Sequence, residues 1–249
     1  MFLLRVSLTS LAVATAAVAL PRDPADLASA PARASASVPA PVHAEGPARG
    51  IDVSHHQGTI DWRAVEADGV RFAFVKASEG TTFTDPAFRG NWAVLGETHI
   101  LRGAYHRFRP RQDAAAQAAH FLAVAPVREG SLPPVLDVEA TEGVSDARLV
   151  RGVRTWLAEV ERRTGVRPVV YTKPGFRRAH LGTALDDHAL WIAQYGERAP
   201  SERWTFWQHS ERGRVAGIAR EVDLDRFNGS HDELAALGPA RGEARLAER

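Results

Sequence analysis

The sequence predicts an α/β protein built as an irregular TIM-like (β/α) barrel with eight strands. Two observations lead to this prediction. From residue 49 onward, short runs rich in β-branched and aromatic residues alternate with segments of helical periodicity. Eight such runs fall within residues 49–238, and eight parallel strands with intervening helices are the number that closes a barrel of this kind.

The first part of this region alternates regularly between strand and helix. Strands are predicted at 50–54, 70–77, 100–108, 134–139 and 168–172, with helices at 62–67, 85–95, 114–124 and 145–164. The helix at 145–164 has the clearest pattern, because its apolar residues recur every three or four positions. Three further strands at 189–195, 204–209 and 221–227 are joined by loops, and we expect all eight strands to be parallel.

The first fifty residues have a different composition. Residues 1–19 combine one positive charge, Arg5, with an apolar stretch that ends in the small residues Ala17-Val18-Ala19. This pattern predicts a signal peptide, or an N-terminal anchor that is retained, and export to the periplasm, the cell envelope or the medium in either case. Residues 20–48 are rich in Ala, Pro and Ser and are predicted to be a disordered linker. Residues 239–249 are predicted to be a charged C-terminal tail.

Charge and cysteine content exclude several function classes. The chain has 31 basic and 30 acidic residues, so no overall positive field attracts nucleic acid. It has no cysteine, which excludes disulfides, thiolate metal sites and a cysteine nucleophile.

Carboxylates mark the strands of the predicted barrel. Asp52 lies on the first strand, Asp137 and Glu139 on the fourth, and Asp223 on the last. Asp137 and Glu139 face the same side of their strand with Cα atoms about 7 Å apart, so their repulsion should raise one pKa. Glycoside cleavage needs such a proton donor beside an ionised partner.

Two other interpretations of these acids stay open. Asp137 could cap a loop while Glu139 forms a surface ion pair. The acids could also bind a metal together with His55, His56 and His106, but no histidine pair has ligand spacing. We therefore expect no metal and no cofactor.

Short motifs connect the chain to a known family. In order, the chain contains GIDVSHHQG at 50–58, IDW at 60–62, FVKASEG at 74–80, GAYH at 103–106, LDVE at 136–139, LWIAQY at 190–195, WQ at 207–208 and VDLD at 222–225. The set resembles the glycoside hydrolases of family 25, the Chalaropsis-type lysozymes. One departure is His55-His56, where the family often has His-Trp.

This resemblance implies a fold, a reaction and roles for the acids. The fold is a barrel of eight strands with about five full helices, formed by a catalytic domain at 49–238. The reaction is that of an N-acetylmuramidase, which hydrolyses the β-1,4 bond between N-acetylmuramic acid and N-acetylglucosamine in peptidoglycan glycan strands. Glu139 is expected to be the general acid/base and Asp137 to orient the substrate's 2-acetamido group, while Asp52 and Asp223 complete the pocket.

Two acids on one strand do not obviously flank the scissile bond, so assistance by the acetamido group with net retention fits better than a protein nucleophile. We expect the enzyme to act as a monomer.

Aromatic and amide side chains near the strand ends are the candidates for sugar binding. Tyr105, Tyr171 and Trp191 could stack on pyranose rings, or simply pack in the core. Gln194 and Gln208 could bind N-acetyl groups of the substrate, or form buried hydrogen-bond ladders within the protein. Lys76 and Glu79 are expected to form an ion pair that braces the pocket.

Three rival functions remain at this point. They are a catalytically silent peptidoglycan-binding module, a metal-dependent sugar deacetylase and a chitinase-like enzyme.

Overall fold

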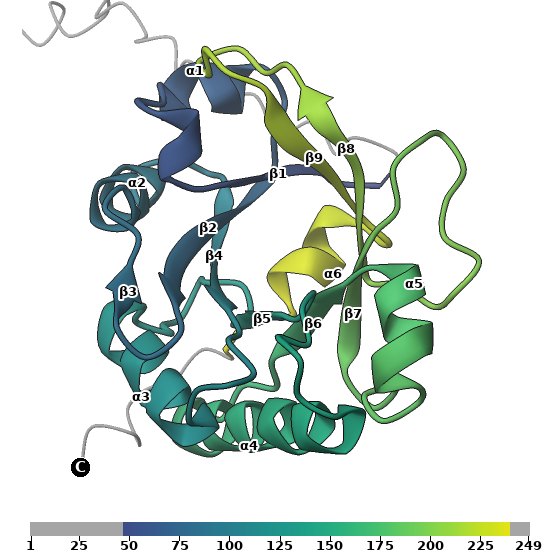
Figure 1. Ribbon diagram of the computed structural model, residues 1–249. Helices are drawn as coiled ribbons and strands as arrows, with labels where there is room; N and C mark the ends of the chain where they lie inside the picture. The colour runs from purple at the N-terminus through teal and green to yellow at the C-terminus, as the bar shows by residue number, and fades with distance from the viewer. Residues whose placement is uncertain (1–46, 240–249) are drawn as a thin grey trace, which may run out of the picture. The chain divides into compact units, whose positions relative to one another are not determined.

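The computed structural model describes residues 47–239, which form a closed barrel of eight strands (Figure 1). The predicted signal peptide or anchor, all but the end of the predicted linker and nearly all of the charged tail lie outside the described residues. None of the helices within residues 47–239 has the length and apolar character needed to cross a membrane.

One sheet supplies the whole barrel wall. Its strands are β1 (Arg49–Val53), β2 (Phe72–Glu79), β4 (Leu101–Arg107), β5 (Val135–Asp137), β6 (Val169–Thr172), β7 (Ala189–Ala193), β8 (Phe206–Gly213) and β9 (Val222–Phe227). The ring closes because β1 pairs with both β2 and β9. A short extra strand, β3 (Phe83–Thr84), pairs with β2 outside the ring. The predicted fold class is confirmed.

The expectation that all eight strands are parallel was wrong for the last one. β9 runs antiparallel to both of its neighbours, β8 and β1. No helix lies between β8 and β9, and a chain that turns back without a crossover pairs antiparallel. As a result Asp223, near the start of β9, is the register partner of Asp52 on β1, and the two acids meet at one end of the barrel.

The helices pack mainly on the outside of the barrel, as Figure 1 shows for α2, α3 and α4. Their bounds are α1 (Trp62–Ala67), α2 (Phe88–Leu95), α3 (Ala114–Val124), α4 (Asp146–Thr164), α5 (Pro174–Phe176) and α6 (His231–Ala235), with a 3-10 turn at His55–Gln57 and a π-helical turn at Arg177–Leu181. The longest, α4, begins at the N-cap Ser145, whose hydroxyl accepts from the Arg148 amide, and ends at Gly165 with φ 71°. After β6 the helices are short, as predicted.

Two apolar layers hold the barrel together. The outer layer lies between the sheet and the helices and includes the buried face of α4, with Val153, Trp156 and Val160. The inner layer fills the barrel itself with side chains such as Phe72, Phe74, Val135, Val169, Trp191, Phe206 and Phe227. Leu234 of α6 is fully buried in this inner layer, so α6 closes the floor of the barrel.

Two glycines make room for the inner layer. Gly103 of β4 is the register partner of Phe74 on β2, and a Cβ atom at this glycine would lie 2.4 Å from the Phe74 ring. Gly50 of β1 stands in the same relation to Phe72, with 2.2 Å to the ring. Both rings are fully buried, so neither can move aside without disturbing the filled barrel.

We therefore expect Gly103→Ala to lower the free energy of unfolding by about 1–3 kcal/mol through overpacking. Gly90→Ala is the matched control, because it lies on the exposed side of α2 with no atom within 4 Å of the added methyl group. The control should be neutral, or stabilising by up to about 1 kcal/mol. Urea unfolding measures both, and equal stabilities for the two variants would contradict this view of the barrel interior.

Candidate active site

The alternation of side chains along each strand builds the site. On β5 the apolar Val135 points into the barrel floor, and Asp137 and then Glu139 follow on the same side toward the open end. On β6 the same phase carries Val169 and then Tyr171. Each strand thus places an apolar residue in the floor and polar residues at the mouth.

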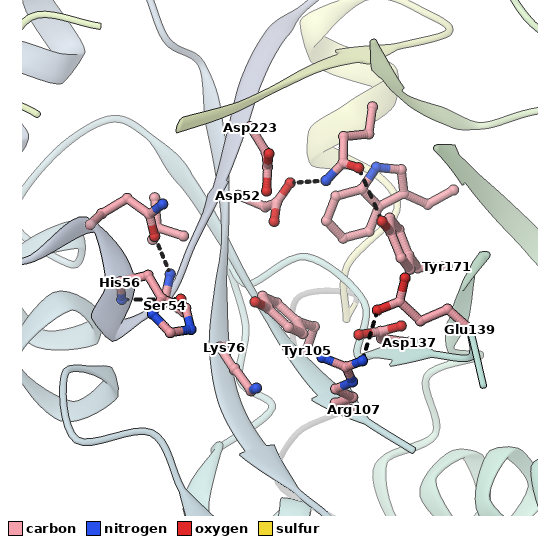
Figure 2. Close-up of a pocket in the computed structure, with 14 residues that line it drawn as sticks. Asp52, Ser54, His56, Lys76, Tyr105, Arg107, Asp137, Glu139, Tyr171 and Asp223 are labelled. Carbon is pink, nitrogen blue, oxygen red and sulfur yellow. Dashed lines mark hydrogen bonds and ion pairs between the residues drawn. The ribbon is translucent and has the colours of Figure 1, made fainter. Parts of the chain in front are cut away.

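These polar residues surround one pocket at the mouth, with a volume of about 200 Å³ (Figure 2). Its lining consists of Asp52, Val53, Ser54, His56, Gln57, Lys76, Tyr105, Arg107, Asp137, Glu139, Tyr171, Trp191, Gln208 and Asp223. All four predicted acids are present, together with the three predicted aromatic residues and Gln208. The other predicted amide, Gln194, is absent from the lining and donates from Nε2 to the Arg198 carbonyl oxygen at 3.1 Å.

The Asp137–Glu139 pair has unequal surroundings. Arg107 Nη2 lies 3.2 Å from one Glu139 oxygen, and Lys173 Nζ lies 3.2 Å from the other. Asp137 is buried, and burial followed by the charge of Glu139 raises its pKa to about 8. Asp137 therefore keeps its proton near neutral pH. The ion pairs considered as an alternative for Glu139 do exist, but they form inside the pocket.

A second group of acids lies across the pocket from this pair. Burial, followed by the charges of Asp223 and Asp225, raises the pKa of Asp52 well above its ordinary value. Burial also raises the pKa of Asp223 to about 6, and that of the fully buried Asp225 well above its ordinary value. Because each raised pKa disfavours the ionised form, the three carboxyl groups resist carrying three charges at the same time.

Gln208 connects Asp52 to the aromatic wall. Its Nε2 donates to Asp52 Oδ2 at 2.7 Å, and its Oε1 accepts from the Tyr171 hydroxyl at 3.0 Å and from the Tyr195 hydroxyl at 3.3 Å. Gln208 is itself buried, so this network fixes the position of the Asp52 carboxyl group.

The three aromatic lining residues differ in how far a ligand can reach them. Trp191 is buried, stacks on Phe74 at 4.7 Å and donates from Nε1 to Asp225 Oδ1 at 2.9 Å. Tyr171 is also buried and packs edge-on against Trp191. Both form the pocket floor as well as part of the core, whereas Tyr105 is half-buried and is the most open of the three.

Several lining residues were not predicted as site residues. His56 and Gln57 come from the 3-10 turn after β1, and Ser54 is the N-cap residue of this turn. Its other member, His55, binds Asp85 through Nδ1 at 2.7 Å. The predicted ion pair between Lys76 and Glu79 is confirmed, with 2.6 Å between Nζ and Oε2.

Arg107 and Lys173 could have been found from the strand phase. Each follows a predicted site residue, Tyr105 or Tyr171, by two positions. Both therefore lie on the inward phase of their strands. Within residues 47–239, no group of three or more His, Asp or Glu side chains is arranged to hold a metal ion.

Comparisons with known proteins agree with this geometry. The family model "Glycosyl hydrolases family 25" matches residues 51–218. The protein YegX of Escherichia coli (strain K12) is 42% identical over 196 residues, covering 76% of this chain and 72% of YegX. Lysozyme M1 of Streptomyces globisporus is 36% identical over 207 residues, covering 76% of this chain and 70% of the relative. The crystal structure of the bacterial lysozyme from Streptomyces coelicolor is 34% identical with a TM-score of 0.74, covering 78% of this chain and 98% of that one.

The raised pKa of Asp225 leads to a prediction about stability. A carboxyl group with a raised pKa keeps its proton in the folded state and releases it on unfolding, so its contribution to stability falls as pH rises above the ordinary value. Asp225→Asn removes this titration but keeps an oxygen that accepts from Trp191. We therefore expect the free energy of unfolding of Asp225→Asn, relative to wild type, to increase as the pH rises above about 4, the ordinary pKa of an aspartate.

Urea unfolding at several pH values measures this difference. Asp225→Leu is the comparison, since it leaves the Trp191 indole N–H without its acceptor and should cost about 1–3 kcal/mol. A difference between Asp225→Asn and wild type that stays constant with pH would contradict the raised pKa.

Proposed function

The chain belongs to family 25 of the glycosyl hydrolases and is a glycoside hydrolase, and we propose that it is an N-acetylmuramidase. It would hydrolyse the β-1,4 bond between N-acetylmuramic acid and N-acetylglucosamine in peptidoglycan. The observation that carries this proposal is the pocket in which the Asp137–Glu139 pair faces Asp52 and Asp223 at the open end of the barrel.

In this proposal the Asp137–Glu139 pair supplies the proton chemistry. Glu139 protonates the glycosidic oxygen as the bond breaks and then removes a proton from the incoming water. Asp137 accepts a hydrogen bond from the N–H of the 2-acetamido group and holds its carbonyl oxygen toward the anomeric carbon. In this role Glu139 carries a proton when the bond breaks, and Asp137 acts as the hydrogen-bond acceptor.

Net retention through the acetamido group is supported by the state of the acids. Asp137 and Glu139 come from one strand and approach the sugar from one side, so the opposite face needs another nucleophile. Asp52 is a weak candidate, because burial and neighbouring charges raise the pKa of its carboxyl group well above its ordinary value and so disfavour the ionised form that a nucleophile needs. The substrate's own acetamido oxygen would therefore attack, while Asp52 and Asp223 bind the sugar.

The rest of the chain fits an enzyme that acts outside the cytoplasm. We propose that residues 1–19 direct export, that residues 20–48 are a tether, and that residues 49–238 act as a monomer on glycan strands. The composition of the N-terminal segment and the character of the substrate support this arrangement. Tyr105, Tyr171 and Trp191 would contact the sugar, and Gln208 would hold Asp52 in place.

We expect Glu139→Gln to reduce the hydrolysis of purified peptidoglycan by about 10²–10⁴-fold, because the amide keeps the shape but has no transferable proton. Glu142→Gln is the matched control, since Glu142 lies three residues further on and binds Arg109 outside the pocket lining. Mass spectrometry of the soluble fragments should show N-acetylmuramic acid at the reducing end for wild type and Glu142→Gln. N-acetylglucosamine there would move the cut to the other bond, and a fully active Glu139→Gln would remove Glu139 from the mechanism.

We also expect the first product to have the β configuration at its new reducing end. The acetamido group inverts the anomeric centre once and water inverts it again, which gives net retention. Proton NMR during the first minutes of hydrolysis distinguishes the two anomers before they interconvert. An initial α product would exclude this mechanism, but it would leave the identity of the cleaved bond unchanged.

A further inference from the structure

We propose that Arg107 and Lys173 bind the lactyl carboxylate of N-acetylmuramic acid, so that the enzyme prefers glycan strands without stem peptides. This inference rests on the proposed muramidase function and adds a substrate preference to it. In intact peptidoglycan the lactyl group is tied up in an amide bond to the stem peptide and has no charge. The carboxylate is free only after an amide-hydrolysing reaction has removed the peptide.

The sheet order places both cations beside the reacting centre. β5, which leads to Glu139, lies between β4 and β6. Arg107 is the last residue of β4 and Lys173 follows β6 directly, so one cation reaches Glu139 from each side. Figure 2 shows Arg107 and its contact with Glu139 at the pocket.

The chemistry of the sugar matches this placement. In N-acetylmuramic acid the cleaved bond is at C1, the acetamido group is at C2 and the lactyl ether is at C3. Arg107 is the register partner of Asp137, the residue proposed to hold the acetamido group. A group on the next carbon of the ring therefore lies close to the Arg107 guanidinium, whose planar fork suits a carboxylate.

These two cations also have the most accessible charged ends. The side chains of Arg107 and Lys173 are 38% and 51% exposed, whereas Glu139 is 18% exposed. Lys76, the other cation in the pocket lining besides Arg107, is only 10% exposed and is already bound to Glu79. A carboxylate that enters the pocket therefore meets Arg107 and Lys173 first.

Binding of this carboxylate would also release Glu139 from its two ion pairs. Among the described residues, Glu139 is the ion-pair partner of both Arg107 and Lys173. When the substrate carboxylate takes over these cations, the ionised form of Glu139 loses its stabilisation and gains a negative neighbour. Loss of both ion pairs would favour the form of Glu139 that can donate a proton to the glycosidic oxygen, which is the role proposed for it.

The experiment compares peptide-free oligosaccharides of alternating N-acetylglucosamine and N-acetylmuramic acid with the same oligosaccharides after conversion of the lactyl carboxylates to methylamides. We expect wild-type kcat/KM to be about ten- to a hundredfold higher for the carboxylate form, the range given by one or two charge-assisted hydrogen bonds. Arg107→Met and Lys173→Met should each reduce this ratio, and the double variant should bring it close to one.

Arg167→Met is the matched control and should keep the wild-type ratio. Arg167 precedes β6, at the opposite end of the strand from Lys173, and binds Asp187 at the surface. A second measurement uses the affinity of Glu139→Gln, whose neutral amide leaves both cations to the ligand. Calorimetry should show that this variant prefers the carboxylate form, and that adding Arg107→Met and Lys173→Met removes the preference.

Three outcomes would overturn the proposal. The first is a ratio of kcat/KM values that is unchanged in Arg107→Met and Lys173→Met. The second is an equal loss of kcat/KM on both substrates in these variants, which would mean that the cations act on Glu139 alone. The third is faster cleavage of peptide-bearing strands that depends on Arg107, which would place the recognised anion on the stem peptide. If wild type cleaves no strand that contains N-acetylmuramic acid, the proposed function itself fails, and this result is distinct from the other three.

Discussion

The period of two along the barrel strands is the constraint on which the site depends. Because successive side chains point to opposite faces, the residues that enter the barrel on one strand are fixed by a single phase. On β5 this phase takes Val135 into the floor and brings Asp137 and Glu139 to the mouth. A shift by one residue would put Leu136 and Val138 into the pocket and the acids among the helices. The apolar packing of the floor thus determines which polar groups meet at the mouth.

The same packing sets the protonation of the acids. The floor excludes water from the lower side of Asp52, Asp137 and Asp225, and this loss of solvation is the largest cause of their raised pKa values. Trp191 takes part in both the packing of the floor and the hydrogen bonding of the acids, because it stacks on Phe74 and donates to Asp225. Only Glu139 of the central pair has cations on both of its oxygens. The difference between Asp137 and Glu139 therefore comes from their depth in the barrel and from the neighbouring strands.

The sequence correctly predicted the structural features that depend on a single chain segment. The helix α4 and the strand phase of Asp137 and Glu139 follow from local periodicity, and the observed bounds lie within a few residues of those predicted. The direction of β9 could not be obtained in this way, because it depends on the chain turning back from β8 to β9 without an intervening helix. Gln194 and Gln208 look alike in the sequence, but only the second reaches the interior, through its pairing with Asp225. The strand phase places Arg107 on the inward side of β4, but its contact with Glu139 depends on the pairing of β4 with β5.

The floor and the mouth of the pocket differ in how freely they can change. A substitution at Trp191 or Tyr171 would alter the inner packing of the barrel as well as the hydrogen bonds of Asp225 and Gln208. Arg107 and Lys173 belong to neither core layer, and the charged ends of both side chains contact Glu139. Replacing them costs little packing energy, yet it changes the charge that a substrate meets beside Glu139. In this fold the chemistry is therefore tied to the core, while the preference for one form of the substrate can change at the strand ends without loss of the barrel.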